Sequence, residues 1–328
     1  MPLPTRRIAD RSVSAMGLGC MPMSWMPMMD KREQALATIH RALDLGIDFL
    51  DTANVYCPTW DEMGHNEVLI AEAFRTYSGP ADVSSVFVAT KGGLTRSEGD
   101  VWGRDASLDG LRTACEKSLR DLDVSTIDLY QLHRTDPRFT VLEQMQTLLA
   151  LHDEGLVRWV GLSNFTLAEF DVAIEILGTP GDGCLASVQN EFSPRCRSDA
   201  DVIDRCEETG IAFLPWSPLG GSRQAHDIGS HYREFAEVGE EAVHILGHLV
   251  ERVIAFGCGA LAVAAGVESQ HLEAFGQQLH LVVPHVQVAG QRMRQRDPRA
   301  VAFDFVVDFN AVGFDFHRSS LFRMMCFC

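Results

Sequence analysis

Four side chains that can carry acid–base chemistry follow three successive predicted β-strands. In a barrel of parallel strands, the carboxyl ends of the strands open onto one face, so residues that are far apart in the sequence converge there. A phenol, an ammonium, a carboxylate and an imidazole are together suited to proton transfer. The residues are Asp51 and Tyr56 in FLDTANVY (49–56), Lys91 in VATKGG (88–93) and His133 in DLYQLHRTDP (128–137).

These four groups suit the reduction of a carbonyl. Hydride delivery to the carbonyl carbon leaves an alkoxide that must be protonated, and a phenol with an ordinary pKa of about 10 is a slow proton donor near neutral pH. A neighbouring ammonium lowers the pKa of the phenol, and a carboxylate holds the ammonium in place. Tyr56 is therefore the candidate acid, tuned by Lys91 and Asp51. His133 is a candidate for orienting the carbonyl oxygen, stabilising the oxyanion or relaying a proton.

Each of these residues alone also has a structural explanation, as a strand-end cap, a partly buried amphipathic side chain or a structural histidine. Lysine is scarce in this chain, however, and occurs only as Lys31, Lys91 and Lys117. A buried charge is costly without a partner, and Asp51 can supply the partner of Lys91. The four residues are therefore more informative together than singly.

Composition sets limits on the function. The chain has 328 residues, of which 46% are hydrophobic, enough for one barrel with long loops or an appended segment. The net charge of −17 disfavours binding to nucleic acid and to anionic membranes. The sequence has no apolar run long enough for a membrane helix, and its start, MPLPTRRIADRS, lacks the apolar core of a signal peptide. We therefore expect a soluble, cytoplasmic protein.

The cysteines do not indicate a metal site or a disulfide framework. Nine cysteines are scattered along the chain, without a Cys-x-x-Cys pair and without a histidine and cysteine cluster at zinc spacing. We expect reduced and mostly buried thiols, and no bound metal.

Apolar strand-like runs alternate with helical patterns, which favours parallel strands joined by crossover helices. Helix starts are indicated by three capping boxes, Asp30 with Glu33, Thr140 with Glu143 and Thr166 with Glu169, and helix ends by Gly46, Gly155 and Gly210. One apolar helix face comprises Leu108, Leu111, Cys115, Leu119 and Leu122. The strand-like runs are Met16–Met21, Phe49–Leu50, Val86–Ala89, Ile127–Leu132, Val157–Leu162, Leu185–Val188 and Ile211–Leu214.

This pattern predicts an α/β fold, a (β/α)8 TIM barrel preceded by a β-hairpin from Arg6 to Val13. The rival topology is an open doubly wound sheet, which normally carries G-x-G-x-x-G at its first strand–helix turn. Here Gly17 and Gly19 are followed by Cys20, Met21 and Pro22 without a third glycine. The sequence therefore favours the barrel.

The three catalytic segments resemble those of the aldo-keto reductases, a family of nicotinamide-dependent carbonyl reductases. The resemblance assigns Tyr56 as general acid, Lys91 and Asp51 as the residues that tune it, and His133 as the residue that positions the substrate. It also places Gly19 to Met21 at the floor of the nicotinamide pocket, although a simple strand-end turn explains these residues equally well.

Three further segments match the cofactor-binding pattern of the family. Within GLSNF (161–165) and SVQNEFSP (187–194), the resemblance places Ser163, Asn164 and Gln189 against the nicotinamide carboxamide, which has a donor and an acceptor to satisfy. In WSPLGG (216–221), it makes Trp216 a platform for the nicotinamide ring. The cradle for the pyrophosphate would be Ser217, Pro218, Leu219, Gly220 and Gly221. Considered one at a time, these residues also have structural explanations: Ser163 and Asn164 could cap a helix, Gln189 could be a polar strand end, and Trp216 could pack in the core.

The resemblance covers about residues 5–222 and then weakens. Residues 1–280 are the expected barrel, and residues 281–328 form an atypical C-terminal tail that contains a strand-like Phe, Val and Asp alternation. The segment 262–275, where the family grips the adenosine end, contains no lysine or arginine, and its Glu268 would repel a phosphate. Arg223 could compensate in part, but it also fits a solvated loop arginine. We expect NADP(H) as the cofactor, with NAD(H) possible, weak binding and a small preference for NADPH.

The predicted function is therefore the reduction of a small-molecule aldehyde or ketone to an alcohol by hydride transfer from a nicotinamide cofactor. One alternative is a cofactor-binding sensor or regulatory subunit with negligible turnover, because relatives in this family serve as such. Another is a lyase that forms a Schiff base on Lys91. Asp51 argues against the lyase, because a carboxylate partner keeps the lysine charged.

Overall fold

A β-hairpin opens the chain in the computed structural model, which describes residues 3–25, 31–193, 196–218 and 305–306. Strand β1 (Thr5–Ile8) pairs in antiparallel register with β2 (Arg11–Ser14). Ile8 and Val13 are buried in the same apolar cluster as Phe49, on the inner face of the sheet. The hairpin predicted at Arg6 to Val13 is confirmed.

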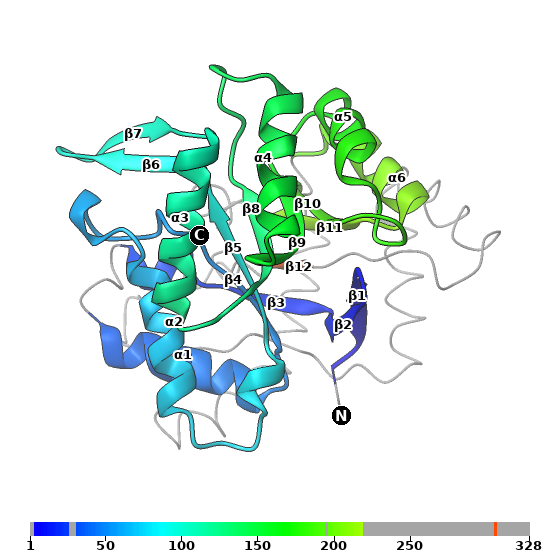
Figure 1. Cartoon of the computed structure of the whole chain (residues 1–328). Helices are drawn as coiled ribbons and strands as arrows, with labels where there is room; N and C mark the ends of the chain where they lie inside the picture. The colour runs from blue at the N-terminus through cyan, green and yellow to red at the C-terminus, as the bar shows by residue number, and fades with distance from the viewer. Residues whose placement is uncertain (1–2, 26–30, 194–195, 219–304, 307–328) are drawn as a thin grey trace.

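Seven parallel strands form a curled sheet with the arrangement of the first seven strands of a (β/α)8 barrel (Figure 1). Their spatial order follows the chain without reversal among the described strands, so the sheet is not doubly wound. A two-residue strand, β12 (Phe305–Val306), pairs in parallel with the first of them. The seven are β3 (Met16–Gly19), β4 (Phe49–Asp51), β5 (Phe87–Gly92), β8 (Ile127–Leu132), β9 (Val157–Ser163), β10 (Leu185–Glu191) and β11 (Ala212–Trp216).

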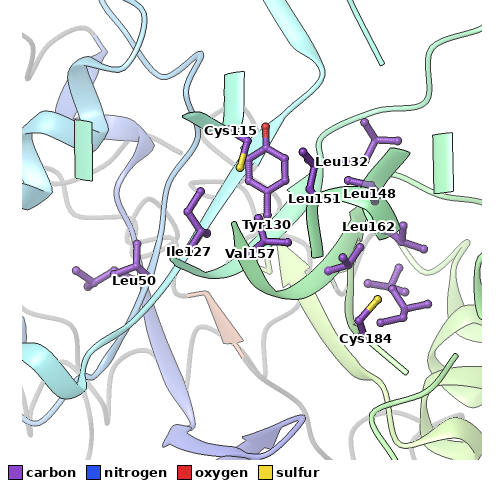
Figure 2. Packing of buried hydrophobic residues seen from close by; sticks show 14 of the residues in the cluster. Leu50, Cys115, Ile127, Tyr130, Leu132, Leu148, Leu151, Val157, Leu162 and Cys184 are labelled. Atoms are coloured by element: carbon purple, nitrogen blue, oxygen red, sulfur yellow. The ribbon is translucent and has the colours of Figure 1, made fainter. Parts of the chain in front are cut away.

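Helices connect these strands and cover the outer face of the sheet (Figure 1). Tyr130 of β8 packs there with Cys115 and Leu148 in the main hydrophobic core (Figure 2). Among the described residues, no helix is long and apolar enough to cross a membrane. The α-helices are α1 (Arg32–Asp44), α2 (His65–Thr76), α3 (Leu108–Leu122), α4 (Val141–Asp153), α5 (Leu167–Leu177) and α6 (Ala200–Thr209), with short 3-10 helices η1 (Met21–Ser24), η2 (Trp60–Glu62) and η3 (Val83–Ser85).

Local signals set most helix ends. Thr140 and Thr166 each begin a helix through a complete capping box, as predicted. Gly210 ends α6 in the left-handed region at φ 71°, a conformation that glycine adopts without steric cost. Gly46 and Gly155 also follow helix ends with positive φ.

One helix prediction stays untested and one needs correction. The capping box predicted at Asp30 lies outside the described residues, and α1 begins at Arg32 after Lys31, whose side chain makes no capping bond. Leu108, the first residue of α3, is 44% exposed and does not belong to the buried face, contrary to the prediction. The rest of that apolar face, including Leu111 and Cys115, packs into the core.

Alternation along the strands positions the polar residues. Phe87 and Ala89 of β5 lie in the inner apolar cluster, and Lys91 continues the same face two residues later. Leu129 of β8 likewise precedes Gln131. The inner face therefore changes from apolar to polar toward the carboxyl ends of the strands, where the candidate site lies.

One hairpin was not expected from the sequence. Strands β6 (Leu94–Ser97) and β7 (Val101–Arg104) pair in antiparallel register directly after β5 and project from the carboxyl end of the sheet (Figure 1). Half of the residues in its two strands are exposed and none is buried, so it lacks the buried apolar alternation that predicts the other strands.

Candidate active site

A fully buried lysine lies at the centre of the site. The side-chain ammonium of Lys91 donates hydrogen bonds to Asp51 Oδ2 and to the backbone oxygen of Thr52, both at 2.8 Å. It also donates to the Tyr56 hydroxyl at 3.3 Å and lies 5.0 Å from the centroid of that ring. Three of the four predicted catalytic residues are thus in direct contact.

The charge of Lys91 is maintained by its partners. Burial by itself lowers the pKa of the ammonium, but the charges of Asp51 and Tyr56 and their hydrogen bonds outweigh burial and leave the pKa of Lys91 raised. Asp51 is also held by neutral donors, since its Oδ1 accepts from Gln189 at 3.1 Å and from Gln131 at 3.4 Å. Both oxygens of the carboxylate therefore have partners.

His133 completes the group of four. Its ring meets the Tyr56 ring edge to face, with centroids 5.8 Å apart and an interplanar angle of 83°. Burial of the ring, aided by the positive charges of Lys91 and Arg134, holds the pKa of His133 well below its usual 6.5. The imidazole is therefore neutral at physiological pH, and one of its nitrogens carries a proton that it can donate.

A second set of side chains surrounds Asn164, just after β9. Its amide nitrogen donates to the backbone oxygen of His133 at 3.1 Å and to Ser163 Oγ at 2.9 Å. Its Oδ1 accepts from the indole nitrogen of Trp216 at 3.2 Å, which fixes the orientation of that half-buried ring. Asn164 has φ 62°, in the left-handed region that asparagine tolerates better than most residues.

Gln189 occupies a position between the two sets. The resemblance assigned its amide to the nicotinamide, but the structure directs its amide nitrogen to Asp51. The side-chain oxygen of Gln189 remains as an acceptor. Asn164 joins the same strand end, because its backbone nitrogen donates to the Gln189 backbone oxygen at 2.9 Å.

The structure describes some of the remaining predicted site residues but not all of them. Gly19 ends β3, opposite Asp51 in the parallel register, and Met21 begins η1 after the intervening Cys20. Ser217 and Pro218 follow Trp216, with Ser217 at φ 48°. The predicted cofactor residues Leu219, Gly220, Gly221 and Arg223, and the predicted domain boundary at residue 280, lie outside the described residues.

Sequence reasoning missed Arg96 of the β6–β7 hairpin. Its guanidinium donates to the backbone oxygens of Cys57 at 2.6 Å and Pro58 at 3.3 Å, in the loop that follows Tyr56. It also pairs with Asp100 and lies 5.4 Å from the Trp25 ring centroid and 5.1 Å from that of Trp102. Through Arg96, the β6–β7 hairpin thus holds the loop that follows the candidate acid, Tyr56.

A buried carboxyl group behind Lys91 was also missed. Glu67 of α2 is fully buried, and its Oε1 accepts from the Thr90 hydroxyl at 2.6 Å. Burial outweighs that hydrogen bond and raises the pKa of Glu67 to about 7. No cluster of three or more histidine, cysteine or acidic side chains in the described part of the chain could hold a metal ion.

Comparison with known proteins agrees with this geometry. The model of the aldo/keto reductase family matches residues 15–246. An uncharacterised oxidoreductase of Schizosaccharomyces pombe is 36% identical over 225 residues, which are 67% of this chain and 68% of that protein.

Solved structures give the same result. Glycerol dehydrogenase from Gluconobacter oxydans superposes with a TM-score of 0.58 at 31% identity over 66% of this chain, although the match spans 63% of the dehydrogenase. The holo form of an aldo-keto reductase from Bacillus halodurans gives a TM-score of 0.56 at 25% identity, over 66% of this chain and 67% of that one. The chain belongs to the aldo/keto reductase family of oxidoreductases.

Proposed function

We propose that this chain reduces a small aldehyde or ketone to an alcohol with hydride from a nicotinamide cofactor, and that Tyr56 is the proton donor. The observation that carries the proposal is the single buried ammonium of Lys91, which lies within hydrogen-bonding distance of both Asp51 and Tyr56. A structural ion pair would need only the carboxylate. The additional contact with a half-buried phenol gives the pair a chemical role.

Tyr56 supplies the proton that the developing alkoxide needs. When its hydroxyl proton leaves, the negative charge on the phenolate faces the Lys91 ammonium across 3.3 Å. This attraction stabilises the phenolate more than the phenol and makes proton donation easier. Asp51 keeps Lys91 charged, because its carboxylate is held in place by three donors.

His133 orients the carbonyl beside Tyr56. As a neutral imidazole, it can donate one hydrogen bond to the carbonyl oxygen while Tyr56 approaches the same oxygen. Its Nδ1 is buried and has no hydrogen-bond partner among the described residues. The backbone oxygen of His133 is fixed by Asn164, so this residue connects the proton donor to the cofactor side of the site.

The residues at the carboxyl ends of β9, β10 and β11 fit a nicotinamide ring and its carboxamide. Ser163 Oγ uses a lone pair for Asn164, which leaves its hydroxyl proton to donate, and Gln189 retains a side-chain oxygen that accepts. One donor and one acceptor match the oxygen and the amino group of a carboxamide. Trp216 would support the ring with its fixed indole. Bound NADPH or NADH would supply the hydride.

Two alternative functions, a Schiff-base lyase and a nucleotide sensor, can be distinguished from carbonyl reduction. A nucleophilic lysine must lose its proton, whereas the partners of Lys91 raise its pKa, which disfavours a Schiff-base lyase. A sensor would bind the nucleotide without turnover. The preference between NADPH and NADH stays a prediction, namely that it is small.

The test is Tyr56→Phe, assayed with a panel of small aldehydes, ketones and sugars and with both nucleotides. Because this variant removes only the transferred proton, kcat should fall by roughly 10²–10⁴-fold while the Kd of the nucleotide stays nearly constant. Tyr77→Phe is the matched control, because the Tyr77 hydroxyl bonds Asp44 on α1 and takes no part in the site. An active Tyr56→Phe enzyme would refute the assignment, and a parent that binds nucleotide without turnover would favour the sensor.

A further inference from the structure

Gln131 lies in a row of inward-facing positions at the level of Lys91. It stands opposite Lys91 of β5 on one side and opposite Gly161 of β9 on the other, and Gly161 in turn stands opposite Ser187 of β10. The side chain of Gln131 is fully buried. Its amide nitrogen is directed at Asp51 Oδ1, at 3.4 Å.

The environment of the Gln131 side chain does not favour the stability of the folded protein. Its side-chain oxygen is buried and has no hydrogen-bond partner among the described residues. An unpartnered buried carbonyl destabilises a protein, and an apolar side chain of the same shape avoids that cost. Gln144 of α4 shows the contrast. Its oxygen accepts from the backbone of Asp136 at 2.8 Å, and its nitrogen donates to the backbone oxygen of Phe139 at 3.0 Å.

The space for Gln131 depends on Gly161. A Cβ atom at Gly161 would lie 2.7 Å from Gln131 Cγ and 2.5 Å from Ser187 Oγ. The backbone of Gly161 is not in the left-handed region, so an alanine could adopt the same conformation. The glycine is therefore explained by the room that the side chains of Gln131 and Ser187 need, rather than by the conformation of the chain.

We propose that Gln131 is a positioning residue for proton donation: together with Gln189 it holds Asp51 Oδ1, so that Oδ2 faces Lys91 and Lys91 in turn faces Tyr56. The inference rests on the proposed function in that Tyr56 is the acid. Gln131 touches neither Tyr56 nor Lys91 through a hydrogen bond that the structure records, and it acts through the carboxylate. The unpartnered oxygen is the cost of placing a donor at this point.

Gln131→Met tests the proposal, because methionine has nearly the same length and lacks the amide. We expect kcat to fall roughly ten-fold, as for a loss of about 1.4 kcal/mol, with a melting temperature no lower than that of the parent. Gln144→Met should show the opposite result, a lower melting temperature with unchanged kcat, because it removes a fully bonded amide remote from the site. Equal kcat in Gln131→Met and the parent would overturn the proposal, as would a kcat loss matched by a lower melting temperature.

A titration of Tyr56 separates this inference from the proposed function. The ultraviolet absorbance of tyrosinate, taken as the difference from Tyr56→Phe, reports the ionisation of Tyr56 without any turnover. With Lys91 less firmly directed, the phenolate loses stabilisation, so Gln131→Met should ionise Tyr56 at higher pH than the parent. An unchanged midpoint overturns the role of Gln131 even if carbonyl reduction is confirmed, and a shifted midpoint supports it even if the parent shows no turnover.

Gly161→Ala provides a second route to the same result. Because the added methyl group displaces Gln131, the alanine variant should reproduce the kcat loss and the shift in Tyr56 ionisation. In the double variant Gly161→Ala with Gln131→Met, the two losses should not add, since the amide is already absent. Additive losses would show that Gly161 acts independently of Gln131 and would count against the proposal.

Discussion

The two sides of the site hold their side chains by different physical means. On one side, at the carboxyl ends of β4 and β5, a buried ion pair between Lys91 and Asp51 holds Tyr56. On the other side, at the carboxyl ends of β9 and β11, the contacts among Asn164, Ser163 and Trp216 are made by neutral amide, hydroxyl and indole groups. We call these the ionic side and the neutral side.

The difference matches the role proposed for each side. A charge removed from water costs several kcal/mol, so a buried pair is retained where a charge is to be formed or neutralised during a reaction. Neutral polar groups cost less to bury than charged ones. Their hydrogen bonds are sufficient to orient a group that stays uncharged, such as an amide. Gln189 connects the two sides, because its side chain donates to Asp51 and its backbone oxygen accepts from the backbone nitrogen of Asn164.

The largest effect is expected from breaking the ionic side. Lys91→Met leaves the buried carboxylate of Asp51 without its counter-charge, so the free energy of unfolding should fall by about 3–5 kcal/mol, with loss of activity. Urea denaturation measures the change.

Arg112→Met is the control, because it breaks an exposed pair with Glu154 and should change stability little. Adding Asp51→Asn to Lys91→Met should restore part of the stability, and a double variant as unstable as the single one would contradict this explanation.

The next effect concerns Glu67, which lies behind the ionic side. Burial raises its pKa from 4.5 to about 7, so the folded protein holds a proton that the unfolded chain releases. The stability of the parent should therefore fall as the pH rises from about 4.5 to about 7, by roughly 3 kcal/mol at ~1.4 kcal/mol per pH unit. Above that window the loss is complete.

Glu67→Gln keeps the hydrogen bond from Thr90 and removes the ionisation. The variant should lack this fall and should be more stable than the parent at neutral pH. Thermal melting of both proteins from pH 4 to pH 8 measures the difference. Identical curves would mean that Glu67 ionises in the folded state as easily as in the unfolded chain.

The smallest effect is expected from the neutral side. Asn164→Gly removes the bonds to the His133 backbone and to Trp216 without backbone strain, so nucleotide binding should weaken by only about two- to ten-fold. Asn164→Ala should bind equally weakly and be less stable than Asn164→Gly by about 1 kcal/mol, because alanine tolerates a φ of 62° poorly. Fluorescence titration and thermal melting distinguish the two, and a hundred-fold loss of affinity would place the neutral side on a level with the ionic one.

The strands, the opening hairpin and the ionic side could be predicted because their signals are local. Ile127–Leu132 is a strand with the predicted bounds, since its apolar run coincides with a strand buried on both faces. Asp51, Tyr56 and Lys91 each follow such a run within a few residues. Parallel strands then bring their carboxyl ends together without further information from the sequence.

The remaining contacts depend on partners that lie far away in the sequence. Gln131 reads as an ordinary polar strand residue until Asp51, 80 positions earlier, is placed opposite its amide. Arg96 lies in an exposed hairpin whose pattern resembles a loop, and its role appears only when Cys57 and Pro58 are packed against it. The resemblance assigned Gln189 to the cofactor, which stays a prediction for its side-chain oxygen, but the resemblance did not indicate that its amide nitrogen donates to Asp51, 138 positions earlier.

The scarcity of lysine and the burial of the thiols have a consequence for chemical durability. Aldehydes form adducts with amines and thiolates, and the sequence offers three lysines among 28 basic residues, of which Lys91 is buried. Burial raises the pKa of Cys115 to about 12 and that of Cys206 to about 12, so these thiols stay protonated and poorly nucleophilic. Guanidinium groups, which supply most of the positive charge, remain protonated as well. Lys91, Cys115 and Cys206 in the described part of the chain are therefore poor targets for electrophiles.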